Sequence, residues 1–437
     1  MTYKPHHIVI QLPLSFSLIA NTSKILACEK QKLGYIRSLD AIRSISMFWI
    51  ITSQIFVYFQ NSDNFVPDIW QHILLSSDFA FDSFFLVSGL TVSLLFFKTR
   101  PDHHQILQPT SWLFFYLYRY IRLTPPYLAI IGVTIAYTNY IQGPFVTWAQ
   151  SLSQIPKSEP CEQKWWQLAL YINNFNGGDQ CIPVIWYLAV DTQMYTIAPI
   201  LLIALYFKPT RGVLLSAIGI VSSFLIVYAF YDLPIDQKSI DMNSSLIYTK
   251  PWTRCTPYII GVLMGHFLAT FGQDKLDMYN TPKVIGWIIS FLLIVISIFI
   301  TYHYEQDWSI FTRASFYNFS KFGFSIAISW IIVATHMGWG GPISMILCHR
   351  LWQPLGKLTH CSFLIHTFVI YYFLSIGAEP LRLISTWSII LHYVVSASFS
   401  TFFGAFFWSC MFEQPALRMQ KLLIKRYKND GNEMEME

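Results

Sequence analysis

Charged side chains are scarce in this chain. Only 12% of its 437 residues are Asp, Glu, Lys or Arg, whereas 54% are hydrophobic and 17% are aromatic, and the mean hydropathy is +0.42. Soluble globular proteins carry about 25% charged residues. The composition therefore excludes an ordinary soluble protein and predicts a polytopic membrane protein.

Several common chemical motifs are also missing. The chain has no Gly-x-Ser-x-Gly elbow, no phosphate-binding loop and no Cys-x-x-Cys pair, and it has no evident internal repeat. Its net charge of +5 comes from Lys and Arg that are spread over short segments rather than gathered into one stripe. These absences argue against the common soluble hydrolases and kinases, and we expect neither a bound metal nor nucleic-acid binding.

Apolar windows long enough to cross a bilayer recur about ten times. We predict an all-α fold with spans near 44–60, 76–97, 123–141, 185–207, 212–231, 252–271, 284–302, 314–336, 354–376 and 384–411. Lys and Arg are more frequent in the segments that share a side with the N-terminus, so the positive-inside rule places both termini in the cytoplasm. The predicted division is a cytoplasmic leader at 1–38, a transmembrane domain at 39–412, and a basic tail with an acidic tip at 413–437.

Two features agree with this orientation. Cys161 and Cys181 fall in the long outer loop at 142–184, where oxidising conditions favour a disulfide over two free thiols. Asn243-Ser244-Ser245 is an N-glycosylation acceptor in another outer loop. We therefore predict a Cys161–Cys181 bridge and a glycan on Asn243.

The first span carries one amide in an otherwise apolar stretch. Gln54 lies eleven residues after Arg43, about 16 Å along a helix and near the middle of the hydrocarbon core. A polar amide at that depth must face protein or water, because an unsatisfied group in lipid costs several kcal/mol. Gln54 either bonds to a neighbouring helix or lies in a buried reaction cleft.

Ionisable residues in the next two spans are functional-site candidates. Asp78 and Asp82 share one helix face and are either solvated, paired or functional. Arg119 and Arg122 lie one turn apart, and we expect Pro125-Pro126 to break or restart the helix just beyond them. Two guanidiniums suit the phosphates of a nucleotide such as coenzyme A, or anchoring to anionic lipid.

The fourth span begins with Trp186 and places Tyr187, Asp191 and Tyr195 on one face. This aromatic stripe with one acid is expected to line a cleft, although Trp186 and Tyr187 alone would suit interface anchors.

Later spans add small residues and histidines. Gly261 and Gly265 suit close helix contact in the span that also carries Arg254. His360 and His366 lie in the ninth span, where each is either a hydrogen-bonded structural residue or a catalyst. Their six-residue spacing matches no zinc motif.

In this order, the motifs resemble those of the acyltransferase-3 family of membrane proteins, and within it the animal nose-resistant-to-fluoxetine group. The resemblance rests on Leu39-Asp40-Ala41-Ile42-Arg43, Asp82 to Gly89, Arg119 to Tyr127, Trp186 to Tyr195, Leu364-Ile365-His366 and Phe412-Glu413-Gln414-Pro415, with Cys161, Trp165-Trp166 and Cys181 matching the outer loop. Animal members usually carry a further Cys-rich outer domain and an additional leading span. Because few residues precede Leu39, we expect a shortened member or an incomplete gene model.

The resemblance implies a membrane O-acyltransferase of the endoplasmic reticulum or plasma membrane. Such an enzyme takes an acyl group, not an aminoacyl group, from cytoplasmic acyl-CoA and passes it to a hydroxyl of a lipid, sterol or glycan. The donor would be held at Arg119 and Arg122, while Arg43 and Asp191 would shape the site. The implied substrate contacts are Asp82, Trp186, Tyr187, Gln193 and Tyr195.

One departure from the family pattern affects the mechanism. Members commonly end the first motif in Gly-His, and that histidine is the proposed base, but this chain has Gln54 there. An amide takes no proton at neutral pH, so general-base catalysis worth roughly 10²–10⁴-fold is not available from this residue. His366 is a candidate substitute. The competing hypothesis is an inactive homologue that binds or transports lipid, and a channel or ion-coupled transporter is the third.

Overall fold

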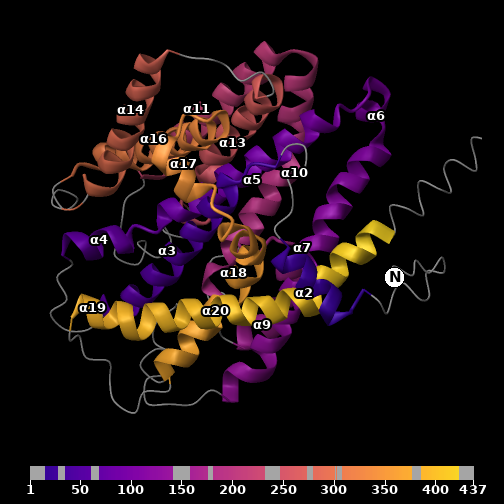
Figure 1. Cartoon of the computed structure of the whole chain (residues 1–437), viewed down its shortest axis with the longest axis vertical. Helices are drawn as coiled ribbons and strands as arrows, with labels where there is room; N and C mark the ends of the chain where they lie inside the picture. Colours follow the sequence, from indigo (N-terminus) through magenta and orange to yellow (C-terminus); the bar gives the residue numbers. More distant parts are fainter. Residues whose placement is uncertain are drawn as a thin grey trace, which may run out of the picture.

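The computed structural model describes residues 15–27, 35–60, 68–140, 158–175, 181–231, 247–272, 279–300, 302, 308–375 and 385–422, and these residues form helices and connections without a strand (Figure 1). The predicted all-α class of a polytopic membrane protein is confirmed. Seven helical stretches of the described residues are long and apolar enough to cross a membrane.

The long helices follow the order of the ten predicted windows, but the third, α7 (Pro109–Tyr137), begins 14 residues before the window predicted at 123–141 and so contains Arg119 and Arg122. These long helices are α3 (Ser38–Gln60), α5 (Asp78–Thr99), α7 (Pro109–Tyr137), α10 (Trp186–Phe207), α11 (Pro209–Tyr231), α13 (Pro251–Phe271), α14 (Asn280–Phe299), α16 (Ile310–Met337), α18 (Trp352–Ser375) and α20 (Val395–Trp408). Shorter elements are α2 (Leu18–Leu26), α4 (Ile69–Leu75), α6 (His103–Leu107), η1 (Thr138–Tyr140), α9 (Ser158–Ala169), η2 (Pro183–Ile185), α17 (Gly341–Leu347), α19 (Thr386–Ile389), η5 (Ile390–Val394) and η6 (Ser409–Glu413). Helices α7, α13 and α18 are as long as the other long helices, but they are not among the seven stretches that are apolar enough to cross a membrane.

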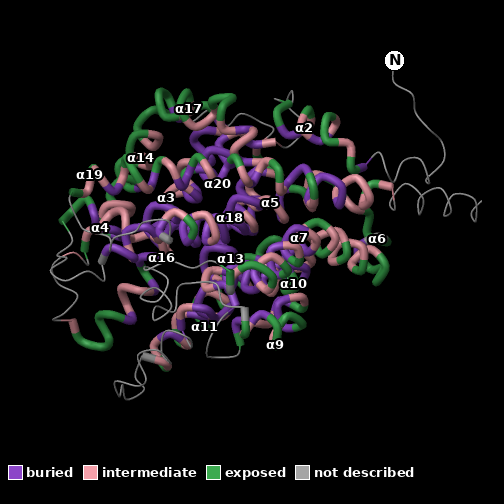
Figure 2. Tube along the Cα trace, turned by 90° about the horizontal axis from the view of Figure 1, so that it is seen from below, coloured by how far each residue is buried: buried purple, intermediate pink, exposed green. Residues whose placement is uncertain are grey.

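The buried residues gather along the central helices, drawn in purple in Figure 2, whereas α17 at the edge has no buried residue. Helices α5 and α13 approach most closely there. A Cβ atom added at Gly261 would lie 2.1 Å from the carbonyl oxygen of Leu86, and one added at Gly265 would lie 2.5 Å from that of Leu90. The predicted close contact through small residues is confirmed.

The expected break at Pro125-Pro126 is wrong, because α7 is a continuous helix from Pro109 to Tyr137. Each proline removes one amide donor but keeps a helical φ angle, and neighbouring helices can stabilise such a segment inside a membrane protein. One such neighbour is Trp408 at the end of α20, whose Nε1 donates to the Pro126 carbonyl at 3.1 Å.

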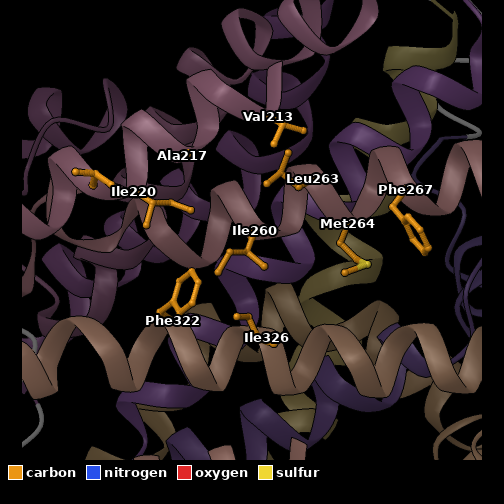
Figure 3. Close-up of a pocket in the computed structure, with 10 residues that line it drawn as sticks. Val213, Ala217, Ile220, Ile260, Leu263, Met264, Phe267, Phe322 and Ile326 are labelled. Atoms are coloured by element: carbon orange, nitrogen blue, oxygen red, sulfur yellow. The ribbon is translucent and has the colours of Figure 1, made fainter. Parts of the chain in front are cut away.

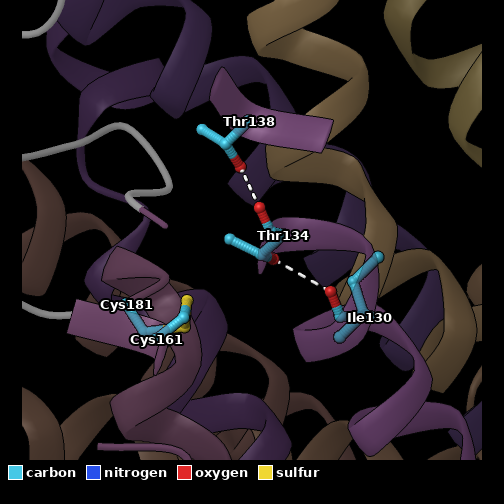
Figure 4. The surroundings of a disulfide bond; sticks show 5 residues. All are labelled: Ile130, Thr134, Thr138, Cys161 and Cys181. Atoms are coloured by element: carbon cyan, nitrogen blue, oxygen red, sulfur yellow. Dashed lines mark hydrogen bonds between the residues drawn. A yellow bond between two sulfur atoms is a disulfide. The ribbon is translucent and has the colours of Figure 1, made fainter. Parts of the chain in front are cut away.

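The predicted disulfide joins Cys161 of α9 to Cys181, which precedes η2, and both cysteines are buried (Figure 4). Beside it, Thr134 of α7 donates to the Ile130 carbonyl at 2.9 Å. The bridge therefore ties α9 to the segment that leads into η2 and α10. The predicted glycosylation site, Asn243, lies outside the described residues.

Part of the predicted leader at 1–38 packs against η6 and α18. Asn21 of α2 is fully buried and its Nδ2 donates to the Cys410 carbonyl at 3.0 Å in η6. Lys357 of α18 donates to the Ala27 carbonyl at 2.7 Å. In Figure 1, α20 accordingly crosses the lower part of the view and ends beside α2.

Candidate functional site

Arg119 of α7 forms an ion pair with Asp191 of α10, although the two residues are 72 positions apart. The Arg119 guanidinium also lies 4.2 Å from the centre of the Tyr195 ring. Tyr195 stacks on Phe115, with ring centres 4.2 Å apart. The pair is mostly shielded from water, since the Arg119 and Asp191 side chains are 16% and 8% exposed. Arg119 is therefore already engaged by protein groups.

Arg122, one turn further along α7, is different. Its side chain is exposed and makes no hydrogen bond or ion pair with another residue in the described ranges. It lies within electrostatic range of Arg43 on α3, Tyr195 on α10 and His360 on α18. A guanidinium with free donors thus faces three other helices.

Arg43 completes this group of cations. Its Nη2 donates to Thr91 Oγ1 of α5 at 3.1 Å, and its Nη1 lies 4.0 Å from Asp40. The side chain is still 31% exposed, so water-accessible space reaches it between the helices. Tyr35 donates a hydrogen bond to Asp40, and burial next to this acceptor raises the pKa of the Tyr35 hydroxyl above its ordinary value. Asp40 is therefore shared between Tyr35 and Arg43.

Tyr187 extends the same cluster. Its hydroxyl interacts electrostatically with Asp191, Arg119 and Arg43, and its ring packs 4.8 Å from that of Phe85. Five predicted residues besides Arg43 are thus brought together. We call the whole group, consisting of Arg43, Arg119, Arg122, Tyr187, Asp191 and Tyr195, the arginine cluster.

Gln193 lies two residues from both Asp191 and Tyr195, but it bonds to the segment that follows α9. Its Nε2 donates to the Tyr171 carbonyl at 2.8 Å and to Asn174 Oδ1 at 2.7 Å. Tyr171 has a left-handed backbone, with φ of 57°, which is uncommon for a non-glycine residue. Gln193 therefore anchors the chain that follows α9 onto α10.

In the described residues neither Gln54 nor His366 forms a hydrogen bond with a residue of the arginine cluster. Gln54 is partly buried and makes no hydrogen bond with another described residue. His366 is fully buried, and its Nδ1 lies 2.6 Å from the Phe363 carbonyl of its own helix, while its Nε2 has no partner among the described residues. Its electrostatic environment contains no charged side chain. Among the residues that the structure describes, no hydrogen bond or ion pair joins His366 to Gln54 or Asp191, although the centre of the Phe363 ring lies 5.4 Å from that of His366 and 5.2 Å from that of Tyr187.

Asp82 belongs to a second group of charges. It is fully buried and forms an ion pair with Arg254 of α13, with 3.1 Å between Oδ1 and Nη1. The Arg254 guanidinium lies 4.4 Å from the Tyr248 ring centre and 5.4 Å from that of Trp186. Lys321 of α16 lies 3.1 Å above the Tyr317 ring and interacts electrostatically with Asp82. This pairing accounts for the positions of both Asp82 and Trp186.

Sequence reasoning noted His360 and Glu413 without choosing them as site residues. His360 of α18 interacts electrostatically with Glu413, Arg122, Arg119 and Asp191. Glu413 is 2% exposed and accepts hydrogen bonds from Ser409 at 2.7 Å and Cys361 at 3.3 Å. The signal that could have found Glu413 is its position inside the closing motif Phe412-Glu413-Gln414-Pro415, whereas His360 lies four residues before the Leu364-Ile365-His366 motif. Within the described ranges, no group of three or more His, Cys, Asp and Glu could hold a metal ion.

A separate groove lies between α11, α13 and α16 (Figure 3). It has a volume of about 580 Å³ and is lined by Val213, Ala217, Ile220, Val221, Ile260, Leu263, Met264, Phe267, Phe322 and Ile326. All of these side chains are apolar, so the groove suits hydrocarbon and offers nothing to a phosphate.

The described residues form a helical membrane protein with the arginine cluster between its helices, and comparison with known proteins identifies its family. The acyltransferase domain of the acyltransferase-3 family matches residues 36–409, so the chain belongs to that family. The predicted resemblance is confirmed.

Among curated relatives, the chain is 29% identical over 480 residues to nose resistant to fluoxetine protein 6 of Caenorhabditis elegans, covering 99% of this chain and 57% of that protein. It is 22% identical over 429 residues to regulator of hypoxia-inducible factor 1 of the same organism, covering 88% and 80%. It is 24% identical over 289 residues to a "Putative O-acetyltransferase" of Staphylococcus aureus (strain COL), covering 64% and 42%. The chain thus spans little more than half the length of the first relative. No solved structure gives a significant match.

Proposed function

We propose that this membrane acyltransferase-family protein transfers an acyl group from acyl-CoA to a hydroxyl of a lipid, sterol or glycan, in the endoplasmic reticulum or plasma membrane. The printed name of the staphylococcal relative supports O-acyl transfer as the reaction type. The observation that carries the proposal is the exposed Arg122 guanidinium, which has free donors and lies beside Arg43.

The division of roles among the arginines follows from their partners. A phosphate needs donors that are accessible and not already paired with a carboxylate. Arg122 meets both conditions and Arg43 meets the first, since it is 31% exposed and 4.0 Å from its nearest acid. Arg119 is engaged by Asp191. The donor phosphates therefore bind at Arg122 and Arg43. Arg119 instead joins α7 to α10 through its ion pair with Asp191.

Replacing Arg122 by alanine is expected to weaken acyl-CoA binding by about 10- to 100-fold. Hydrogen bonds to charged groups contribute about 1.5–3 kcal/mol each, and about 1.4 kcal/mol corresponds to a tenfold change. The measurement is calorimetric titration of acetyl-CoA into the purified full chain in nanodiscs. Arg211→Ala, at an exposed arginine of α11, is the matched control and should bind normally. Unchanged binding by Arg122→Ala would rule out this donor site.

Gln54 supports a second candidate function, lipid binding or transport without acyl transfer, because the residue makes no hydrogen bond with the described residues and cannot act as a base. The discriminating experiment compares acetyl-CoA turnover by the wild-type chain and by Gln54→His. If the protein is an active acyltransferase, wild-type turnover should lie within tenfold of the variant's. Turnover that appears only in Gln54→His would identify the wild-type chain as the inactive homologue.

A further inference from the structure

The histidine within electrostatic range of the arginine cluster is His360 on α18, a helix that packs against both α7 and η6. Histidine is the most common general base in enzymes, and such a base must lie near the reacting groups. His360 interacts electrostatically with two guanidiniums, those of Arg119 and Arg122, and with two carboxylates, those of Asp191 and Glu413. The four charges balance, so a neutral imidazole leaves the group without net charge.

The ring of His360 also has unused hydrogen-bonding capacity. Its Nε2 is shielded from water and has no hydrogen-bond partner among the described residues, while the residue as a whole remains partly exposed. A buried polar atom without a partner calls for an explanation, and a role with a ligand is one such explanation. His366 also has an unpartnered Nε2, but it is fully buried and has no charged neighbour.

Glu413 is hydrogen-bonded to Cys361, the neighbour of His360 in α18. It closes η6, a π-helical turn at the end of α20, and such turns are frequently found at functional sites. One of its carboxylate oxygens, Oε2, accepts hydrogen bonds from Ser409 and Cys361, which immobilise the side chain. Because Cys361 is the next residue after His360 in α18, its hydrogen bond ties Glu413 to the part of the helix that carries His360.

We propose that His360 is the general base of this site and that Glu413 is its positioning residue. The inference rests on the proposed acyl transfer. The acceptor oxygen attacks the thioester carbonyl carbon while its proton passes to a ring nitrogen of His360. The carbon–sulfur bond then breaks, and the same proton passes to the departing sulfur, so that the products are an ester and the coenzyme A thiol. The pantetheine arm lets the phosphates bind at exposed Arg122 while the thioester reaches deeper.

His360→Gln is expected to lower acetyl-CoA turnover by about 10²–10⁴-fold, the usual contribution of a general base, with acetyl-CoA binding retained. The assay measures release of the coenzyme A thiol by the full chain in phosphatidylcholine nanodiscs that contain cholesterol and diacylglycerol as hydroxyl acceptors. His266→Gln on α13 is the matched control, since His266 packs against Phe97 outside the cluster. Its turnover should equal that of the wild type.

Two further readouts separate a chemical role from a structural one. Added imidazole should restore part of the turnover of His360→Ala, because it fills the space and supplies the missing base. Glu413→Gln should lower kcat about tenfold while leaving the KM for acetyl-CoA unchanged. Turnover by His360→Gln within tenfold of the wild type would overturn the assignment and leave acyl transfer standing. A wild-type chain that releases no thiol would overturn the proposed function and the assignment together.

Discussion

Asp82→Ala is expected to destabilise the folded protein by about 3–5 kcal/mol, the usual cost of removing one partner of a buried ion pair. Asp82 and Arg254 are both fully buried, so the variant would leave the Arg254 charge without its carboxylate. Lys321 lies in the same cluster and would add a second cation. The measurement is the free energy of unfolding of the full chain in detergent micelles.

A double variant tests the reason for this loss. Asp82→Leu combined with Arg254→Met removes both charges and keeps apolar volume, and such replacements of buried pairs are often neutral or stabilising. We therefore expect the double variant to be more stable than Asp82→Ala. Glu162→Ala, at an exposed acid of α9, is the control and should change stability by less than about 0.5 kcal/mol. Equal stability of Asp82→Ala and the control would show that the ion pair contributes nothing.

Gly261→Ala is expected to destabilise the protein by about 3 kcal/mol, at the upper end of the usual range for overpacking. The added Cβ would lie 2.1 Å from the Leu86 carbonyl oxygen, and backbone atoms cannot move aside as a flexible side chain can. Helices α5 and α13 would have to separate along their whole contact. The loss should appear in thermal unfolding followed by size-exclusion chromatography.

Gly132→Ala is the comparison variant, and we do not expect it to lower the stability of the protein. Gly132 lies inside α7, and a Cβ added there meets nothing within 4 Å. Alanine is favoured over glycine inside a helix by about 1 kcal/mol, so this variant should be neutral or slightly stabilised. A similar loss in both variants would show that the effect of Gly261→Ala does not come from its close contact with Leu86.

The features that could be predicted from the sequence are local. Long apolar windows indicated the helices, because backbone groups in lipid must be satisfied within each segment. Gly261 and Gly265 indicated a close helix contact through their size, and the structure identifies α5 as the partner. Pro125-Pro126 is the exception, since packing of α7 against its neighbours outweighed the local preference of proline.

The pairing of charges could not be predicted in this way. Asp82 lies 172 positions from Arg254, and Arg119 lies 72 positions from Asp191. Hydropathy reports only that each residue is costly in a span, not which residue on another helix neutralises it. The same limit applied to His360 and Glu413, because their distance in space depends on how α18 packs against η6.

The sequence by itself determined the helical class, the membrane setting, the bridge between Cys161 and Cys181 and the family, because each of these depends on composition or on motifs within a short stretch of chain. Only the tertiary structure decided that Arg119 is paired whereas Arg122 is accessible, and that His360 rather than His366 lies within electrostatic range of Arg119 and Arg122. The physical reason is that partner choice depends on helix rotation and packing, and a single span's side-chain pattern does not specify them.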